Sequence, residues 1–324
     1  MIIERISKDE DIMAAATLAH AEHARLFAPN PWLPPRTRGD YEARIGWMIR
    51  EGAVFALREG ATIRAFLGGF TLENFRNEGP GSLSPDWCMG FSDGIDAGPA
   101  ARELIRAVLS HADGEGLTIH AAGILDARRE VREAFFLSGY GAIVLDLARA
   151  TADLSRDLES RPVDRGEAPV IVRRAEGRDA ERLAALDALL AGHVRAAPPL
   201  MPGAHGSDAG EWREWLAKEE ARAFVALEGD RIVGFMKAED PQFDVSYTVH
   251  GPSTFAIDGL FVEPASRGRG IARALLGSIV REATARGKTV TSVDCETMNP
   301  EACGFWTRWF TPVSWSLERR WGAV

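Results

Sequence analysis

A glycine-rich turn at residues 267–272 has the composition that an anion-binding loop needs. It reads Arg267, Gly268, Arg269, Gly270, Ile271 and Ala272. Because Gly268 and Gly270 carry no Cβ, the backbone can direct several N–H groups toward one point. A helix that begins here adds its unpaired N–H groups and the positive end of its dipole. The turn therefore predicts a site for a pyrophosphate.

The flanking elements distinguish this turn from a second Arg-x-x-Gly-x-Gly match at residues 76–81. In that second match Pro80 removes a backbone donor and no helical pattern follows, so we interpret it as a plain loop. Before the turn at 267–272, residues 255–262 form an apolar strand pattern. After it, residues 271–286 repeat apolar side chains near a 3.6-residue period. Only this turn joins a strand to a helix.

With these flanks the chain resembles the GNAT acyltransferase superfamily, whose acetyl-CoA pyrophosphate loop has the form Gln/Arg-x-x-Gly-x-Gly/Ala. Residues 299–310 are similar to the family's Asn-x-x-Ala-x-x-Phe-Tyr helix and its exit. Two departures are that Trp306 stands where the family usually has a tyrosine, and that Trp309 and Phe310 replace a Gly-Phe pair. The resemblance implies that acetyl-CoA is the cofactor and that the turn holds its pyrophosphate.

The resemblance also implies roles for single residues. The backbone N–H of Leu260 is expected to stabilise the developing oxyanion. Phe261 and Val262 are expected along the pantetheine arm, with Val262 pairing to it as a strand would. Asn299 is expected near the same arm, although a role as helix N-cap would explain it equally. Trp306 is expected at the cofactor, but its indole N–H is a feeble acid, which leaves the proton donor for the departing thiolate open.

Acetyl transfer also requires a group that accepts the proton of the amine. Asp258 lies in the otherwise apolar strand before the turn, where similar enzymes direct a histidine or an acid at the acceptor amine. Partial desolvation would raise the pKa of such a carboxyl toward that of a useful base. The alternative is a structural aspartate satisfied by an arginine or a backbone N–H. The proton donor to the departing thiolate could be Tyr247 or ordered water, or the thiolate could depart without a donor. Tyr247 is alternatively a plain aromatic residue of a hairpin. His250 is a further candidate proton carrier.

The bulk composition indicates a soluble protein of two domains. The chain has 324 residues, of which 46% are hydrophobic and 26% are charged. No apolar run approaches the ~20 residues of a membrane span, and the N-terminus lacks the pattern of a signal peptide, so we expect a cytoplasmic location. Cys88, Cys295 and Cys303 are widely spaced and indicate neither a metal site nor a disulfide framework.

The formal net charge of −9 bears on the partners. It disfavours nucleic acid and anionic membranes and favours a small cationic amine as the substrate. A homodimer is left open.

Short blocks of sequence recur in the two halves with a constant offset of 170 residues. The matched pairs are 53–57 with 223–227, 135–140 with 305–310, and 145–147 with 315–317. We therefore expect a duplicated fold with a first domain at 1–150, a polar, proline-bearing linker at 151–169 and a second domain at 170–324. The alternative is that two α/β domains share their spacing by accident.

The same offset places residues 97–102 opposite the glycine-rich turn. There Pro99 lacks an N–H group and Ala100 replaces the second glycine. We therefore expect a first domain that is GNAT-like but has no pyrophosphate loop.

The expected fold class is α/β (α+β), with two GNAT-like domains that each form a mixed, mostly antiparallel sheet flanked by helices. The second half is expected to contain strands at 170–174, 221–228, 231–239 and 255–262 and helices at 179–194 and 210–220. The long loop within residues 195–215 is expected either to act in substrate selection or to be disordered, with Trp212 either as a wall of the pocket or in the core.

The leading hypothesis is an acetyl-CoA-dependent N-acetyltransferase in which a small amine attacks directly in a ternary complex. The alternative is a non-catalytic acyl-CoA-binding sensor.

Overall fold

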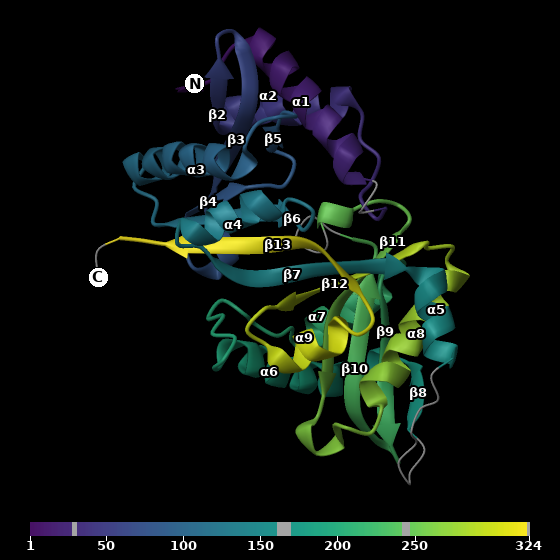
Figure 1. Ribbon diagram of the computed structural model, residues 1–324. Helices are drawn as coiled ribbons and strands as arrows, with labels where there is room; N and C mark the ends of the chain where they lie inside the picture. Colours follow the sequence, from purple (N-terminus) through teal and green to yellow (C-terminus); the bar gives the residue numbers. More distant parts are fainter. Residues whose placement is uncertain (28–30, 161–169, 242–246, 323–324) are drawn as a thin grey trace. The chain divides into compact units, whose positions relative to one another are not determined.

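The computed structural model describes residues 1–27, 31–160, 170–241 and 247–322. Contacts divide the chain into two units, which are unit 1 (Met1–Leu145 and Pro312–Val324) and unit 2 (Asp146–Thr311). In each unit helices flank a mixed sheet, as the sequence predicts (Figure 1). None of the helices within the described ranges is long and apolar enough to cross a membrane.

Unit 1 has a sheet of strand order β1-β2-β3-β4-β6-β13, with β5 paired to β3. The strands are β1 (Ile2–Arg5), β2 (Gly52–Glu59), β3 (Thr62–Leu72), β4 (Gly81–Ser84), β5 (Met89–Phe91), β6 (Ile119–Leu125) and β13 (Thr311–Arg320). The helices are α1 (Asp9–Phe27), α2 (Arg38–Glu51), α3 (Ala97–Gly114) and α4 (Arg129–Leu137). Only the pair β4 and β6 is parallel among the pairings described for this sheet.

Both faces of this sheet are covered, because alternate side chains of a strand point to opposite faces. On β3, Phe66 joins the buried cluster that includes Met48 of α2. Its neighbours Ala65 and Leu67 join a separate cluster that includes Leu104 of α3. The continuous apolar run of β3 is thus explained by two cores rather than one.

Unit 2 has the strand order β7-β12-β11-β10-β9-β8, and of its described pairs β11 and β12 are parallel and the others antiparallel. The strands are β7 (Gly141–Ala150, in unit 2 from Asp146), β8 (Ile171–Arg174), β9 (Arg222–Glu228), β10 (Arg231–Glu239), β11 (Thr254–Val262) and β12 (Val290–Glu296). The helices are α5 (Thr151–Ser160), α6 (Ala180–Arg195), α7 (Ala209–Ala217), α8 (Ile271–Ala285) and α9 (Pro300–Trp306).

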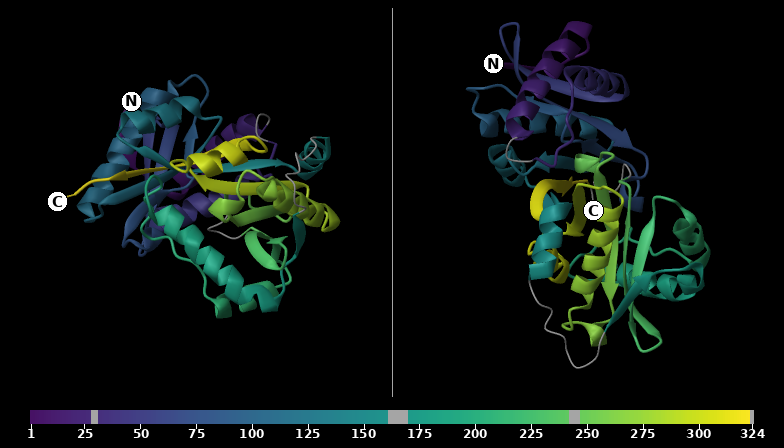
Figure 2. Two further views of the ribbon diagram at one scale, coloured as in Figure 1. Left: turned by 90° about the horizontal axis from the view of Figure 1, so that it is seen from below. Right: turned by 90° about the vertical axis from the view of Figure 1, so that its right-hand side faces the viewer.

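The helices of unit 2 also lie on both sides of its sheet. One core contains Leu183 of α6, Trp212 of α7 and Phe235 of β10. On the other face α8 packs on β9 and β10, and α5 lies beside α8 (Figure 1 and Figure 2). This packing fixes the N-terminal end of α8, where the glycine-rich turn lies.

The element order repeats at the offset found in the sequence. β2 begins at Gly52 and β9 at Arg222, and β7 begins at Gly141 and β13 at Thr311, so both pairs are 170 positions apart. Apart from the additional strand β5, the first half therefore carries the same succession of strands and helices as the second.

The boundaries of the units differ from the expected 1–150 and 170–324. The last strand, β13, belongs to unit 1, where it pairs with β6 through Trp315 opposite Ile124, and the end of β7 belongs to unit 2. Each half of the chain thus contributes strand residues to the unit formed mainly by the other half. Within the expected linker, residues 151–160 form α5, and residues 161–169 lie outside the described residues.

The expectation that Trp212 forms a pocket wall is wrong. Its side chain is 1% exposed, and its Nε1 donates a hydrogen bond to Oδ2 of Asp187 on α6 at 3.2 Å. The same carboxylate accepts a bond from the N–H of Ser207 at 2.9 Å. Asp187 therefore fastens the segment before α7 to α6, and the tryptophan belongs to the core.

Candidate active site

Two parallel strands of unit 2 stop pairing partway along their length. β11 and β12 pair as far as Ile257 and Val293, whereas β11 continues in register with β10 to Val262. Beyond the last pair, Leu260 and Val262 line a cavity of about 470 Å³. The edge of β11 that leaves β12 is therefore the edge from which a bound chain could receive backbone hydrogen bonds.

A bulge in β11 lies at the point where the strands separate. Lys237 of β10 stands opposite both Asp258 and Gly259, where the register between the two strands shifts. Gly259 has φ of +155°, and a Cβ there would lie 3.0 Å from Cε of Lys237. Glycine is required because the lysine side chain passes directly over this position.

The turn at residues 267–272 has the backbone that its sequence predicts. Gly268 has φ of +76° and Gly270 has φ of +77°, and α8 begins at the next residue. A Cβ at Gly268 would meet no atom within 4 Å, so glycine is needed here for its conformation rather than for space. The first N–H groups of α8 have no intrahelical acceptor, which makes this turn a site for an anion.

The arginines of the turn are held by neighbouring acids. Arg267 donates from Nε to the carbonyl oxygen of Val262 at 3.0 Å and forms an ion pair with Glu301. Arg269 forms an ion pair with Glu228. Their positions are therefore fixed, and the backbone N–H groups are the donors available to a ligand at the turn.

The cavity brings together most of the predicted site residues. Those that line it are Asp258, Leu260, Phe261, Val262, Arg267, Gly268, Ala272, Asn299 and Trp306. The sequence did not single out several further lining residues, which include His193, Asp294, Cys295, Glu296 and Glu301. Asp294 and its neighbours come from β12, whose alternating pattern predicted the strand but not the role of its polar side chains.

Three residues of the turn lie near the cavity without lining it. Ile271 is buried at 2% exposure in the packing of α8, Gly270 is the N-cap of that helix, and Arg269 points to Glu228. Their contribution to the site is to shape the backbone of the turn.

The structure does not bring His250 to the cavity. Its side chain is exposed, and it is not among the described residues that line the cavity. Tyr247 begins a short 3₁₀ helix, Tyr247–Val249, and its side chain lies outside the described part of the chain. The sequence alone could not separate these two residues from Asp258, because all three lie within twelve positions.

Asp258 is paired with a lysine rather than with the arginine or backbone N–H expected for a structural aspartate. Nζ of Lys237 lies 2.8 Å from Oδ2 of Asp258 and 5.6 Å from the ring centres of Trp212 and Trp215. Burial opposes the charge on this lysine, but the carboxylates of Asp258, Asp187 and Glu239 together outweigh that effect and raise the pKa of Lys237. The lysine thus stays charged and holds the carboxylate at the bulge.

We expect Lys237→Met to lower the free energy of unfolding by about 1–3 kcal/mol at pH 7, because it leaves the half-buried Asp258 without its partner. The pKa of Lys237 is raised in the folded protein, so its contribution is complete below the ordinary lysine pKa and is lost as pH rises through the folded value. Urea titrations at neutral and strongly alkaline pH measure this difference.

The control for this prediction is Lys8→Met, because Lys8 is 74% exposed and its nearest acid, Glu10, lies 3.7 Å away. It should change stability by less than about 0.5 kcal/mol. Equal losses in the two variants would show that the pair at the bulge contributes nothing.

Asp294 lies on β12 among other acids. Loss of water, followed by the negative charges of Asp146, Asp258 and Glu296, raises the pKa of its carboxyl well above the usual range. No ion pair to Asp294 is found within the described residues. This carboxyl therefore differs from Asp258, although both line one cavity.

Asn299 and Trp306 lie at the two ends of α9. The side-chain Oδ1 of Asn299 accepts a hydrogen bond from the N–H of Ala302 at 3.2 Å, which confirms its role as N-cap, and it lies 3.5 Å from Nε2 of His193. Trp306 is 4% exposed and packs edge-on against Phe305. The indole therefore forms part of the apolar wall of the cavity.

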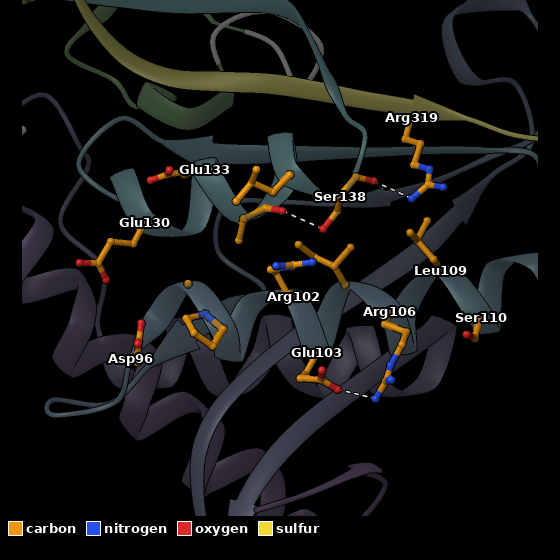
Figure 3. A pocket seen from close by; sticks show the side chains of 15 residues that line it. Asp96, Arg102, Glu103, Arg106, Leu109, Ser110, Glu130, Glu133, Ser138 and Arg319 are labelled. Carbon is orange, nitrogen blue, oxygen red and sulfur yellow. Dashed lines mark hydrogen bonds and ion pairs between the residues drawn. The ribbon is translucent and has the colours of Figure 1, made fainter.

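The counterpart of the turn in unit 1 is helical. α3 begins at Ala97, so residues 97–102 form its first turns. A cavity of about 960 Å³ lies here between α3 and α4 (Figure 3). Its charged lining residues are Asp96, Arg102, Glu103, Arg106, Glu130, Glu133 and Arg319. Arg106 pairs with Glu103, and Arg319 donates to the carbonyl oxygen of Ser138 at 2.6 Å. The four acids of this lining would repel a pyrophosphate, and the segment before α3 lacks the two positive-φ glycines that precede α8.

The chain is similar to known proteins in part of its sequence and in its fold. Residues 191–310 match the model of the acetyltransferase (GNAT) family. The crystal structure of a GCN5-related N-acetyltransferase from Sphaerobacter thermophilus has a TM-score of 0.56 at 15% identity and covers 99% of this chain and 96% of that chain. A GCN5-related glucosamine N-acetyltransferase region of a fungal multi-domain GH3 β-N-acetylglucosaminidase has a TM-score of 0.53 at 15% identity, over 98% of this chain and 38% of that chain. No protein with a curated description matches the sequence.

The family match and the fold bear on different parts of the chain. Residues 191–310, within the second half, are similar to the GNAT acetyltransferase family. The first half repeats much of the element order of the second but lies outside this match. At 15% identity the two solved structures bear on the fold alone.

Proposed function

We propose that unit 2 binds acetyl-CoA and transfers the acetyl group to the amine of a small cationic or polar molecule, by direct attack in a ternary complex. The observation that carries this proposal is the cavity of about 470 Å³, which is lined both by the separated strand β11 and by the glycine-rich turn. One continuous surface thus offers backbone donors to a pyrophosphate and a strand edge to an extended arm.

The residues present suit the cofactor. The positive φ angles of Gly268 and Gly270 open the turn toward an anion, and the N-terminus of α8 adds a positive dipole end. Leu260 to Val262 pair with β10 along one edge and line the cavity along the other. Apolar lining by Phe305 and Trp306 is compatible with a pantetheine arm.

Different residues of the chain would then carry the separate steps of acyl transfer. When bound, acetyl-CoA supplies a thioester carbonyl that an amine can attack. The N–H of Leu260 is the proposed donor to the oxygen on which negative charge develops. Asp258, which Lys237 holds at 2.8 Å, is the proposed acceptor for the proton of the amine.

The charge of the cavity supports a cationic acceptor. Asp258, Glu296 and Glu301 line it, and of the basic side chains that line it Arg267 is already paired with Glu301. A cationic molecule would be attracted to this lining, whereas an anionic acceptor would be repelled. The acceptor is therefore proposed to carry positive charge besides the reacting amine, or to enter as an ammonium ion that loses a proton before it attacks.

A screen of amines with acetyl-CoA, followed through the release of free thiol, tests the proposal. We expect thiol release that depends on both the protein and one class of cationic amine. Binding of acetyl-CoA without turnover of any amine would favour a non-catalytic acyl-CoA sensor. Absence of binding would contradict the cofactor itself.

A further inference from the structure

Two carboxyl groups lie side by side where β11 and β12 separate. Ile257 and Val293 form the last pair between these parallel strands, and the next residue on each strand is an aspartate, Asp258 and Asp294. Neighbours in register on parallel strands point to the same face of the sheet. Both aspartates line the same cavity, in agreement with this placement.

The charged groups around the two carboxyl groups have opposite signs. Asp258 has the ammonium group of Lys237 from β10 at 2.8 Å, which is a contact made by a carboxylate. Asp294 faces Asp146 on β7, Asp258 on β11 and Glu296 on its own strand. Within the described residues, no Lys, Arg or His forms an ion pair with Asp294. Burial and these three negative neighbours raise the pKa of the Asp294 carboxyl, which favours its protonated form.

Two other groups that line the cavity are poor proton donors. Trp306 offers only an indole N–H. The thiol of Cys295 is buried, with its sulfur 3.4 Å from the sulfur of Cys303, and burial raises its pKa. No tyrosine is among the described residues that line the cavity, and His193, which does line it, has its Nε2 3.5 Å from Oδ1 of Asn299. A thiolate that departs from the acyl group can therefore receive a proton from the Asp294 carboxyl.

We propose that Asp294 is the general acid of the transfer, donating its proton to the sulfur of the departing thiol while Asp258 accepts the proton of the attacking amine. This inference rests on the proposed function. The bond from the amine nitrogen to the acyl carbon forms as the bond from that carbon to sulfur breaks. One proton moves from nitrogen to Asp258 and one from Asp294 to sulfur, so the products are an amide and a free thiol. Transfer of a proton from Asp258 to Asp294 restores both groups.

Infrared difference spectroscopy with CoA as the probe tests the proton on Asp294 directly. The wild-type protein at pH 7 should show the C=O stretch of a protonated carboxyl, and CoA should shift this band because the proton then faces sulfur. The band should be absent from Asp294→Asn. In Asp258→Asn it should remain but titrate at lower pH, because one negative neighbour of Asp294 is lost.

The second readout is the pH profile of turnover with an amine found in the screen. An acid that must be protonated loses its effect as pH rises through its pKa, so the wild-type profile should fall on the alkaline side. Asp294→Asn should lower kcat by about 10²-fold and remove this alkaline fall, while calorimetry shows CoA bound as before.

A missing carboxyl band, a band that CoA leaves unchanged, or a band that persists in Asp294→Asn would overturn the inference. So would Asp294→Asn with wild-type kcat and an unchanged alkaline fall. A wild-type protein that fails to bind CoA in the calorimeter would overturn the proposed function, and the inference with it. The two failures are therefore distinguishable.

Discussion

Asp258→Asn is expected to lower turnover with an amine by roughly 10²–10⁴-fold while acetyl-CoA still binds. The amide has the shape of the carboxylate but cannot accept a proton. Because the fraction of free amine grows with pH, the loss should shrink at high pH. Steady-state rates across pH, together with calorimetric titration of acetyl-CoA, measure both parts of this prediction.

A structural role for Asp258 would give the opposite pattern. The aspartate pairs with Lys237 at 2.8 Å, so the variant also loses an ion pair and should unfold at lower temperature. Lys237→Met disturbs the same pair but retains the carboxylate, which makes it the matched comparison. An Asp258→Asn protein that melts early but turns over as the wild type does would end the assignment of this residue as the base.

Gly270→Pro is expected to weaken acetyl-CoA binding by about 100-fold or more and to abolish the rise in melting temperature that acetyl-CoA causes. Gly270 has φ of +77°, which proline cannot adopt, and proline also removes a backbone N–H group from the turn that is proposed to bind the pyrophosphate. Thermal melts with and without acetyl-CoA measure the effect.

Two variants separate binding from strain in this experiment. Gly287→Pro places the same residue at φ of +69°, just beyond the other end of α8, and should lower stability while leaving the response to acetyl-CoA intact. Pro99→Gly alters the corresponding segment of unit 1 and should change neither property. If Gly287→Pro removed the response as fully as Gly270→Pro, strain in α8 rather than lost contacts would be the cause.

The parts of the site that follow from local backbone chemistry could be predicted from the sequence. Gly268 and Gly270 adopt positive φ, and a helix starts directly after them, as the motif between a strand and a helix indicates. Asn299 is an N-cap because its side chain acts on the residues that follow it. Such features depend on a few consecutive residues.

The features that depend on pairing between distant segments could not be predicted. Lys237 lies opposite Asp258 because a bulge shifts the register between β10 and β11. No local sequence pattern predicts that shift. In the sequence, Asp294 is one polar residue of an alternating strand. Only the register between β12 and β11 places it beside Asp258. The raised pKa of its carboxyl follows first from burial and then from the negative charges of Asp146, Asp258 and Glu296.

The exchange of the last strands has the same origin. Leu145 to Leu147 of β7 and Trp315 to Leu317 of β13 share a pattern, so the sequence permits either strand to pair beside β6. In the structure β13 takes that place. A repeat thus predicts the order of the elements but not which copy of a strand completes which sheet.

The crystal structure of the protein grown with acetyl-CoA would test the central claim most directly, with a calorimetric titration to count the sites. We expect one molecule per chain, its pyrophosphate against the N–H groups of residues 268–270 and its arm along Leu260 to Val262. Acetyl-CoA held at residues 97–102 of unit 1, or a titration that shows no binding, would contradict the account.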